Sequence, residues 1–270
     1  MRRRKLLVAA ITFAPLLGIF SNRAKPRNRI AAERILGQIS SSSWLFKVSA
    51  DSKRVACLAK GGSRVSVVVD GEEGKKYDTI GRSSPIFSPD SQRVAYAAGV
   101  GGRWLVVIDG EEGKKYDGIL GDSLIFSPNS KRVAYGARTG ERWSLVVDNR
   151  ESKEQEYDAI GTPIFSPDSQ RVAYAAGVGN KQLVVVDGEE KKKYDAIMGG
   201  TPLFSPDSRR VVYAAVMGNN WLMVVDGEEG KGKYENILGS GGARIVFDSP
   251  NSLHYLGIKG NRIYLVEETL

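Results

Sequence analysis

Short apolar runs alternate with turn-forming residues along most of the chain. The segment 85–119 is representative: a Ser-Pro-Asp-Ser turn, a glycine-rich turn and an Asp-Gly turn separate its apolar runs. Runs of about four to eight residues between such turns are typical of strands, and this region has no convincing helical period. The strands expected in the segment, called a, b, c and d in chain order, span 85–87, 93–98, 104–108 and 115–119.

This four-strand unit recurs at a fixed spacing. Phe-Ser-Pro-Asp or a close variant starts at residues 48, 87, 126, 165 and 204, which are 39 apart, and a degenerate sixth copy starts at 247. Four antiparallel strands in about 40 residues are typical of a propeller blade, whose two apolar faces must be covered by neighbours. We therefore predict an all-β, six-bladed β-propeller of four-stranded antiparallel blades. Its repeats start near residues 44, 85, 124, 163, 202 and 244.

The two ends of the repeat region predict how the ring closes. The sixth copy has its strand c at 262–266, and too few residues follow to supply a strand d. Ala-Glu-Arg-Ile-Leu-Gly at 32–37 matches Tyr-Glu-Asn-Ile-Leu-Gly at 234–239, the strand d of the fifth copy. We expect the N-terminal segment to complete the last blade and so remove the exposed sheet edges. A short linker helix over 29–38 is the alternative.

The net charge of +8 belongs to the N-terminal segment. Residues 1–29 hold eight of the 39 basic side chains and no acid, which leaves 31 basic against 31 acidic groups in the rest of the chain. A nucleic-acid-binding protein needs a basic face on its folded domain. The charge distribution therefore predicts no nucleic-acid partner.

The first 20 residues have the pattern of an export signal. Arg-Arg-Arg-Lys at 2–5 precedes an apolar stretch at 6–20, which is short for a membrane-spanning helix. We expect residues 1–20 to be a signal peptide or an N-terminal membrane anchor, 21–30 to be a basic linker and 31–270 to be the propeller. The protein is thus expected to be periplasmic or secreted, or anchored to the inner membrane by the apolar stretch, its one membrane contact.

One repeated motif resembles a known family. Phe-Ser-Pro-Asp-Ser-Gln-Arg-Val-Ala-Tyr-Ala-Ala, at 87–98 and 165–176, is similar to the WD40-like (PD40) repeats of TolB-type bacterial propellers, and the resemblance covers about residues 32–270. It implies a periplasmic protein that binds other envelope proteins. The separate N-terminal α/β domain of TolB proteins has no counterpart in these residues.

Few residues offer catalytic or metal-binding chemistry. His254 is the only histidine and aligns with a strand alanine, and Cys57 is the only cysteine and stands where other copies have a tyrosine. The Asp-Gly-Glu-Glu runs, of which 70–73 is the first, are followed by lysines, which favours solvated hairpins over calcium sites. No Gly-x-Ser-x-Gly motif is present. We expect no metal, no cofactor and no catalytic residues, and hence a non-enzymatic protein.

The repeats differ most at the turn between strands b and c. Segments 87–119 and 165–197 share 27 of 33 positions, and three of the six differences adjoin one another at 102–104 and 180–182. In propellers the b–c and d–a loops share one face, and loops on a rigid scaffold usually carry function. We predict that this face binds a protein partner. The candidate binding residues are Arg82, Arg103, Trp104, Asp122, Arg138, Arg142, Trp143, Asn180, Lys181, Asn219 and Trp221.

Three alternatives stay open at this point. The variation among the turns is also what drift of unconstrained loop tips would produce. The tryptophans that open strand c suit packing between blades, but as exposed platforms they would stack on a carbohydrate or small ligand at the central funnel. A hydrolase or lyase built from funnel carboxylates and arginines is the third alternative.

Overall fold

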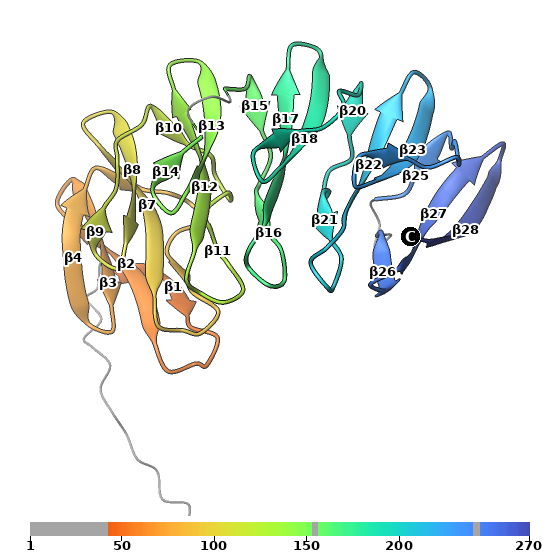
Figure 1. Ribbon diagram of the computed structural model, residues 1–270. Coiled ribbons are helices and arrows are strands. Elements are labelled where there is room, and N and C mark those ends of the chain that lie inside the picture. Colours follow the sequence, from red (N-terminus) through yellow and green to blue (C-terminus); the bar gives the residue numbers. More distant parts are fainter. Residues whose placement is uncertain (1–42, 153–155, 240–243) are drawn as a thin grey trace, which may run out of the picture. The chain divides into compact units, whose positions relative to one another are not determined.

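The computed structural model describes residues 43–152, 156–239 and 244–270. They belong to one compact unit, Leu36–Leu270; the other unit, Met1–Ile35, lies outside the described residues. All regular structure in the described part is β-strand, which confirms the predicted all-β class, and it holds no helix able to cross a membrane. The strands form six antiparallel sheets, which we number 1 to 6 in chain order (Figure 1).

Sheets 2 to 5 share one topology. Strand a is split into two short halves that both pair with the long strand b; strand c pairs with b, and a short strand d pairs with c. In sheet 2 these are β5 (Thr79–Ile80), β6 (Ile86–Phe87), β7 (Val94–Val100), β8 (Arg103–Ile108) and β9 (Glu111–Glu112). In sheet 3 they are β10 (Gly118–Ile119), β11 (Ile125–Phe126), β12 (Val133–Thr139), β13 (Arg142–Val147) and β14 (Arg150–Glu151).

The next two sheets repeat this arrangement. Sheet 4 consists of β15 (Ala159–Ile160), β16 (Ile164–Phe165), β17 (Val172–Val178), β18 (Lys181–Val186) and β19 (Glu189–Glu190). Sheet 5 consists of β20 (Ala196–Ile197), β21 (Leu203–Phe204), β22 (Val211–Met217), β23 (Asn220–Val225) and β24 (Glu228–Glu229).

The first and last sheets have four strands each. Sheet 1 is ordered β1 (Ser43–Val48), β2 (Val55–Gly61), β3 (Arg64–Val69) and β4 (Glu72–Tyr77). Sheet 6 consists of β25 (Asn236–Ile237), β26 (Val246–Ser249), β27 (Ser252–Lys259) and β28 (Arg262–Thr269). In sheet 6 both β25 and β26 pair with one side of β27 and β28 pairs with the other.

The strand d predicted over 115–119 is divided between two sheets, so its predicted bounds are wrong. Tyr116 bridges Trp104 in sheet 2, whereas Gly118–Ile119, as β10, pairs with Arg138 and Ala137 of β12 in sheet 3. Strand a therefore begins near residue 118 rather than 124. The apolar pattern continues across this point because both sheets bury the segment, so the pattern alone does not show where one sheet ends.

Apolar residues between successive sheets form the core. These buried clusters combine strands b and c of one sheet with strands a, b and c of the next. Five T-shaped tyrosine pairs recur at these junctions, with ring centroids 5.8–6.3 Å apart. Burial raises the pKa of the Tyr213 phenol, in the pair between sheets 4 and 5, to about 12. The repeats therefore stabilise each other mainly through one recurring interface.

Hydrogen bonds made by the Ser-Pro-Asp-Ser turn account for the fixed spacing of 39 residues between the repeats. Ser88 Oγ donates to Asp90 Oδ1 at 2.6 Å and accepts from the backbone N–H of Arg93 at 2.9 Å. The backbone N–H of Asp90 donates to Ser130 Oγ of the next turn at 2.9 Å. The Ser88 bond lowers the pKa of the Asp90 carboxyl. Each of the first four turns thus closes on itself and also attaches to the next turn along the chain.

An arginine at the start of strand b makes the second link between sheets. Arg132 Nε donates to Asp148 Oδ2 of its own sheet at 2.9 Å, and its Nη1 donates to the carbonyl of Gln170 in sheet 4 at 2.9 Å. Its guanidinium also lies 5.2 Å from the ring centroid of Phe165. The same set recurs at Arg54, Arg93 and Arg171.

The two end sheets lack parts of this linkage. Ser252 stands in sheet 6 where the other sheets have the arginine, and Val48 stands in sheet 1 in place of the phenylalanine. Val48 is 59% exposed, and Ile263 and Leu265 of β28 are 67% and 62% exposed. The predictions of a signal, a linker helix and ring closure depend on segments 1–20, 29–38 and 32–37, which all lie outside the described residues.

Candidate functional site

The b–c turns are attached to the chain that enters their sheet. Gly101 in the turn of sheet 2 donates its N–H to Asp78 Oδ2 at 2.7 Å, and Asp78 directly precedes strand a of that sheet. Gly140, Gly179 and Gly218 make the equivalent bonds to Asp117, Asp158 and Asp195 at 2.6–2.7 Å. The b–c turns and the chain that enters each sheet therefore meet at one end of the sheet.

Three of the predicted basic anchors are already ion-paired. Arg103 Nε lies 3.1 Å from Asp117 Oδ1, and Lys181 Nζ lies 2.5 Å from Asp195 Oδ1. Arg142 forms the same ion pair with Asp158. Lys181 lowers the pKa of the Asp195 carboxyl. Each base therefore links strand c of its own sheet to the chain that enters the next sheet, and this local role accounts for its presence in the repeat.

The predicted tryptophans are half-buried and pack within the fold. Trp104 on strand c lies opposite Gly99 on strand b, and a Cβ added at that glycine would be 3.5 Å from Cε2 of the indole. Arg138 lies over the Trp143 ring, 5.8 Å from its centroid. Trp221 packs against the cluster between sheets 5 and 6. These contacts favour the predicted packing role over an open stacking platform.

The remaining predicted residues are exposed. Asn180 and Asn219 lie in the b–c turns of sheets 4 and 5, beside the strands that those turns join. Arg82 and Asp122 lie elsewhere: their loops interrupt strand a, between β5 and β6 and between β10 and β11, and do not connect strand d to strand a. The structure thus divides the predicted residues between the b–c turns and the edge of strand a.

Candidate chemical groups are few within residues 43–152, 156–239 and 244–270. No cluster of three or more metal-ligating side chains occurs in this part of the chain. His254 Nδ1 lies 2.8 Å from Asp248 Oδ1, across the β26–β27 hairpin. Cys57 is buried on β2. The His254–Asp248 pair lies within one hairpin, and its histidine is half-exposed. This arrangement is consistent with a local substitution in a strand.

A cavity that the sequence did not predict lies between sheets 4 and 5. It has a volume of about 550 Å³ and is lined by small and apolar residues of both strand-a segments, together with Ala175, Gly177 and Gln182. Gln182 takes the place that tryptophan has in sheets 2, 3 and 5. The available sequence signal was this replacement, one of the three adjoining differences at 180–182.

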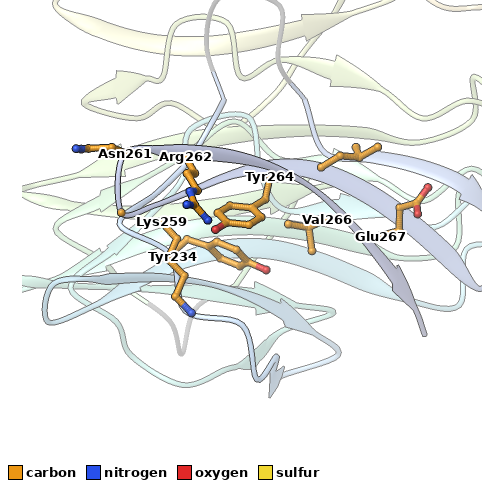
Figure 2. A pocket seen from close by; sticks show the side chains of 9 residues that line it. Tyr234, Lys259, Asn261, Arg262, Tyr264, Val266 and Glu267 are labelled. Carbon is orange, nitrogen blue, oxygen red and sulfur yellow. The ribbon is translucent and has the colours of Figure 1, made fainter.

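A second cavity of about 720 Å³ follows the outer side of β28. Figure 2 shows Tyr234, Lys259, Arg262 and Tyr264 together near one end of the strand, with Val266 further along it. In sheets 2 to 5 the corresponding edge of strand c pairs with strand d, whereas within the described residues β28 pairs with β27 alone. This edge therefore has backbone groups available for one more strand.

Comparisons with known proteins give structural likenesses only. No family model and no curated protein matches the chain. Solved structures that resemble it include TolB from Acinetobacter baumannii, at 15% identity and a TM-score of 0.38 over 69% of this chain. The match spans about half, 53%, of that TolB chain.

Two further structures are similar to this chain. The β-propeller domain of the trilobed protease from Pyrococcus furiosus has 11% identity and a TM-score of 0.44, over 86% of this chain and 82% of that one. An oligogalacturonate lyase in complex with manganese has 10% identity and a TM-score of 0.40, over 72% of this chain and 68% of that one. The structural neighbours thus include β-propeller proteins with different functions.

Proposed function

We propose that this protein is a non-enzymatic binding scaffold of the bacterial cell envelope and that its b–c turns contact a protein partner. One observation carries the proposal: the repeated side chains are used within the fold, whereas the turn tips vary and are exposed. Asp117 and its equivalents hold each turn in place, and Arg103 and its equivalents support the next sheet. On this fixed base the exposed tip residue is a glycine in sheet 2 (Gly102), a glutamate in sheet 3 (Glu141) and an asparagine in sheets 4 and 5 (Asn180 and Asn219).

We propose further that the six sheets are the six blades of a PD40-type propeller. The unpaired edge of β28 supports closure by residues 32–37, because a strand added there would cover the exposed Ile263 and Leu265. Ser43 already lies opposite Ala59 in sheet 1, so this segment would pair with β28 and not with β2. Export by residues 1–20 would place the protein in the periplasm, consistent with a partner in the envelope.

The test is a cross-linked pull-down from envelope extract with the full chain as bait. Asn180→Arg combined with Asn219→Arg enlarges two turn tips without touching an ion pair. Gln92→Arg combined with Gln170→Arg is the matched control at the opposite turns, because Arg209 naturally occupies the equivalent position in sheet 5. A protein retained by the wild type and the control but lost by the turn variant supports the proposal. Equal retention by all baits, or no specific protein, overturns it.

A further inference from the structure

The three adjoining differences between the repeats coincide with the cavity between sheets 4 and 5. Segments 87–119 and 165–197 are nearly identical, yet Trp104 of one corresponds to Gln182 of the other. Trp143 and Trp221 occupy the same position in sheets 3 and 5. Residues 87–101 and 165–179 are identical, so the chain provides its own comparison, in which strand b is kept and the indole opposite it is removed.

The space left by the indole is not refilled from within sheet 4. Gln182 lies opposite Gly177, as Trp104 lies opposite Gly99. The Gln182 side chain turns aside, because its Oε1 accepts a hydrogen bond from the Ile197 N–H at 2.7 Å. The three atoms nearest to a Cβ added at Gly177 would all belong to Ala159, at 3.6–3.8 Å, whereas at Gly99 two of the three belong to Trp104. The face of Gly177 is thus open to the cavity.

A shorter loop deepens the same space. Three residues, Gly161 to Pro163, separate the halves of strand a in sheet 4, whereas five separate them in sheets 2, 3 and 5. In sheet 3 the longer loop places Ser123 Oγ 3.0 Å from the N–H of Gly136, in the middle of strand b. The equivalent Ala175 of sheet 4 is half-buried, whereas Gly136 is buried. Two independent changes therefore open one cavity.

The chemistry of the cavity fits a planar apolar ring. Its volume of about 550 Å³ is within the range of ligand pockets, roughly 300–1,000 Å³. All its lining residues are uncharged, and most are Gly, Ala, Ile or Leu. The Gln182 amide and the Thr162 side chain provide polar groups at the lining, which suits a ring with one polar atom.

We propose that this cavity binds an aromatic side chain, of tryptophan type, presented by the protein partner. The inference rests on the proposed function, since it places the partner's anchor residue beside Asn180 and the b–c turn of sheet 4. Aromatic anchors in well-packed pockets commonly dominate the energetics of protein interfaces. The partner's ring would take the position that Trp104, Trp143 and Trp221 take in the neighbouring sheets.

The experiment measures binding of N-acetyl-tryptophanamide to the full chain by ligand-observed NMR, with N-acetyl-leucinamide as the aliphatic comparison. We expect saturable binding with a dissociation constant on the order of 1 mM, as for a small fragment. Gln182→Trp restores the sibling residue and is expected to weaken binding at least about tenfold. Gly177→Val, which copies Val216 opposite Trp221, is a second variant that narrows the cavity.

The matched control is Asn180→Gly with Lys181→Arg, which copies the sibling turn but leaves Gln182 in place and should bind the probe as the wild type does. Absence of saturable binding, equal binding of the leucine compound, or binding that persists in Gln182→Trp and Gly177→Val would each overturn the inference. If the pull-down recovers a partner while the probe fails, the proposed function stands and the aromatic anchor is refuted. If the probe binds as expected but no partner is recovered, the cavity takes a free aromatic compound, and the anchor is refuted as well.

Discussion

The link that Arg132 makes between sheets 3 and 4 allows a quantitative test, because the chain holds a natural control. Arg132 and Arg210 have similar exposure, 31% and 33%, and each pairs with an aspartate of its own sheet, at 2.9 and 3.7 Å. Arg132 also donates to the carbonyls of Ser169 and Gln170 in the next sheet and lies over Phe165. Among the described residues, Arg210 has the aspartate contact alone.

Replacing each arginine by alanine separates these contributions. The partly exposed ion pair contributes roughly 0–1 kcal/mol in either case. The two bonds to carbonyls contribute together about 1–1.5 kcal/mol after allowance for solvent, and the contact with Phe165 about 0.5 kcal/mol. We therefore expect Arg132→Ala to lower the free energy of unfolding by about 1.5–2 kcal/mol more than Arg210→Ala does. Urea denaturation, compared at constant m-value, measures the difference. A difference below about 0.5 kcal/mol would refute the role assigned to the inter-sheet bonds.

Three further outcomes are expected. Tyr213 has a pKa of about 12 in the folded protein, above its ordinary value of 10, so the folded state binds more protons between these two values. The free energy of unfolding should therefore fall as the pH rises above 10. Phenolate absorbance should appear together with the loss of the circular dichroism signal, and ionisation before unfolding would contradict this expectation. The hydrogen bond from Ser88 lowers the pKa of the Asp90 carboxyl, so this bond stabilises the fold above pH 3.8 and is lost as the pH falls further. Ser88→Ala should therefore destabilise the protein at neutral pH and much less at pH 2–3. Measuring the unfolding midpoint of both proteins over this pH range would check the expectation. A Cβ added at Gly136 would lie 2.7 Å from an isoleucine methyl, whereas the nearest atom to a Cβ added at Gly161 would be 3.6 Å away. Thermal denaturation should show that Gly136→Ala destabilises the protein by about 1–3 kcal/mol and that Gly161→Ala does so far less. Similar values for the two variants would contradict the packing described.

The repeat made the fold class predictable from the sequence, but it did not make the boundaries between sheets predictable. Turns such as Ser-Pro-Asp-Ser have strong local preferences, so strands b and c lie close to where the pattern placed them. The segment from Tyr116 to Ile119 leaves sheet 2 and enters sheet 3. Where it does so depends on contacts with residues far along the chain, which a local pattern does not encode. The count of six blades and the closure of the ring stay predictions.

The b–c turns were predicted as the candidate site, whereas the cavity beside the turn of sheet 4 was not predicted. The b–c turns stood out because Gly102 to Trp104 differ from Asn180 to Gln182, and the structure has its cavity beside that difference. The ion pairs of Arg103 and Arg142 were not foreseen, because their aspartates lie 14 and 16 residues later and the spacing has meaning only after strand d is folded. Sequence comparison of the repeats finds what changes; it does not say which charges are already paired.

The links at the Ser-Pro-Asp end all point one way along the chain, and this gives folding an order during synthesis. Arg54 and the N–H of Asp51 donate to acceptors that lie 37–40 residues later, and the repeats that hold Arg93, Arg132 and Arg171 do the same. A ribosome therefore releases the donors of each repeat first and their acceptors about 2–8 s afterwards, at 5–20 residues per second. A chain halted at any point has unmatched donors in its newest repeat alone. We therefore expect the links between N-terminal repeats to be complete before those between later repeats.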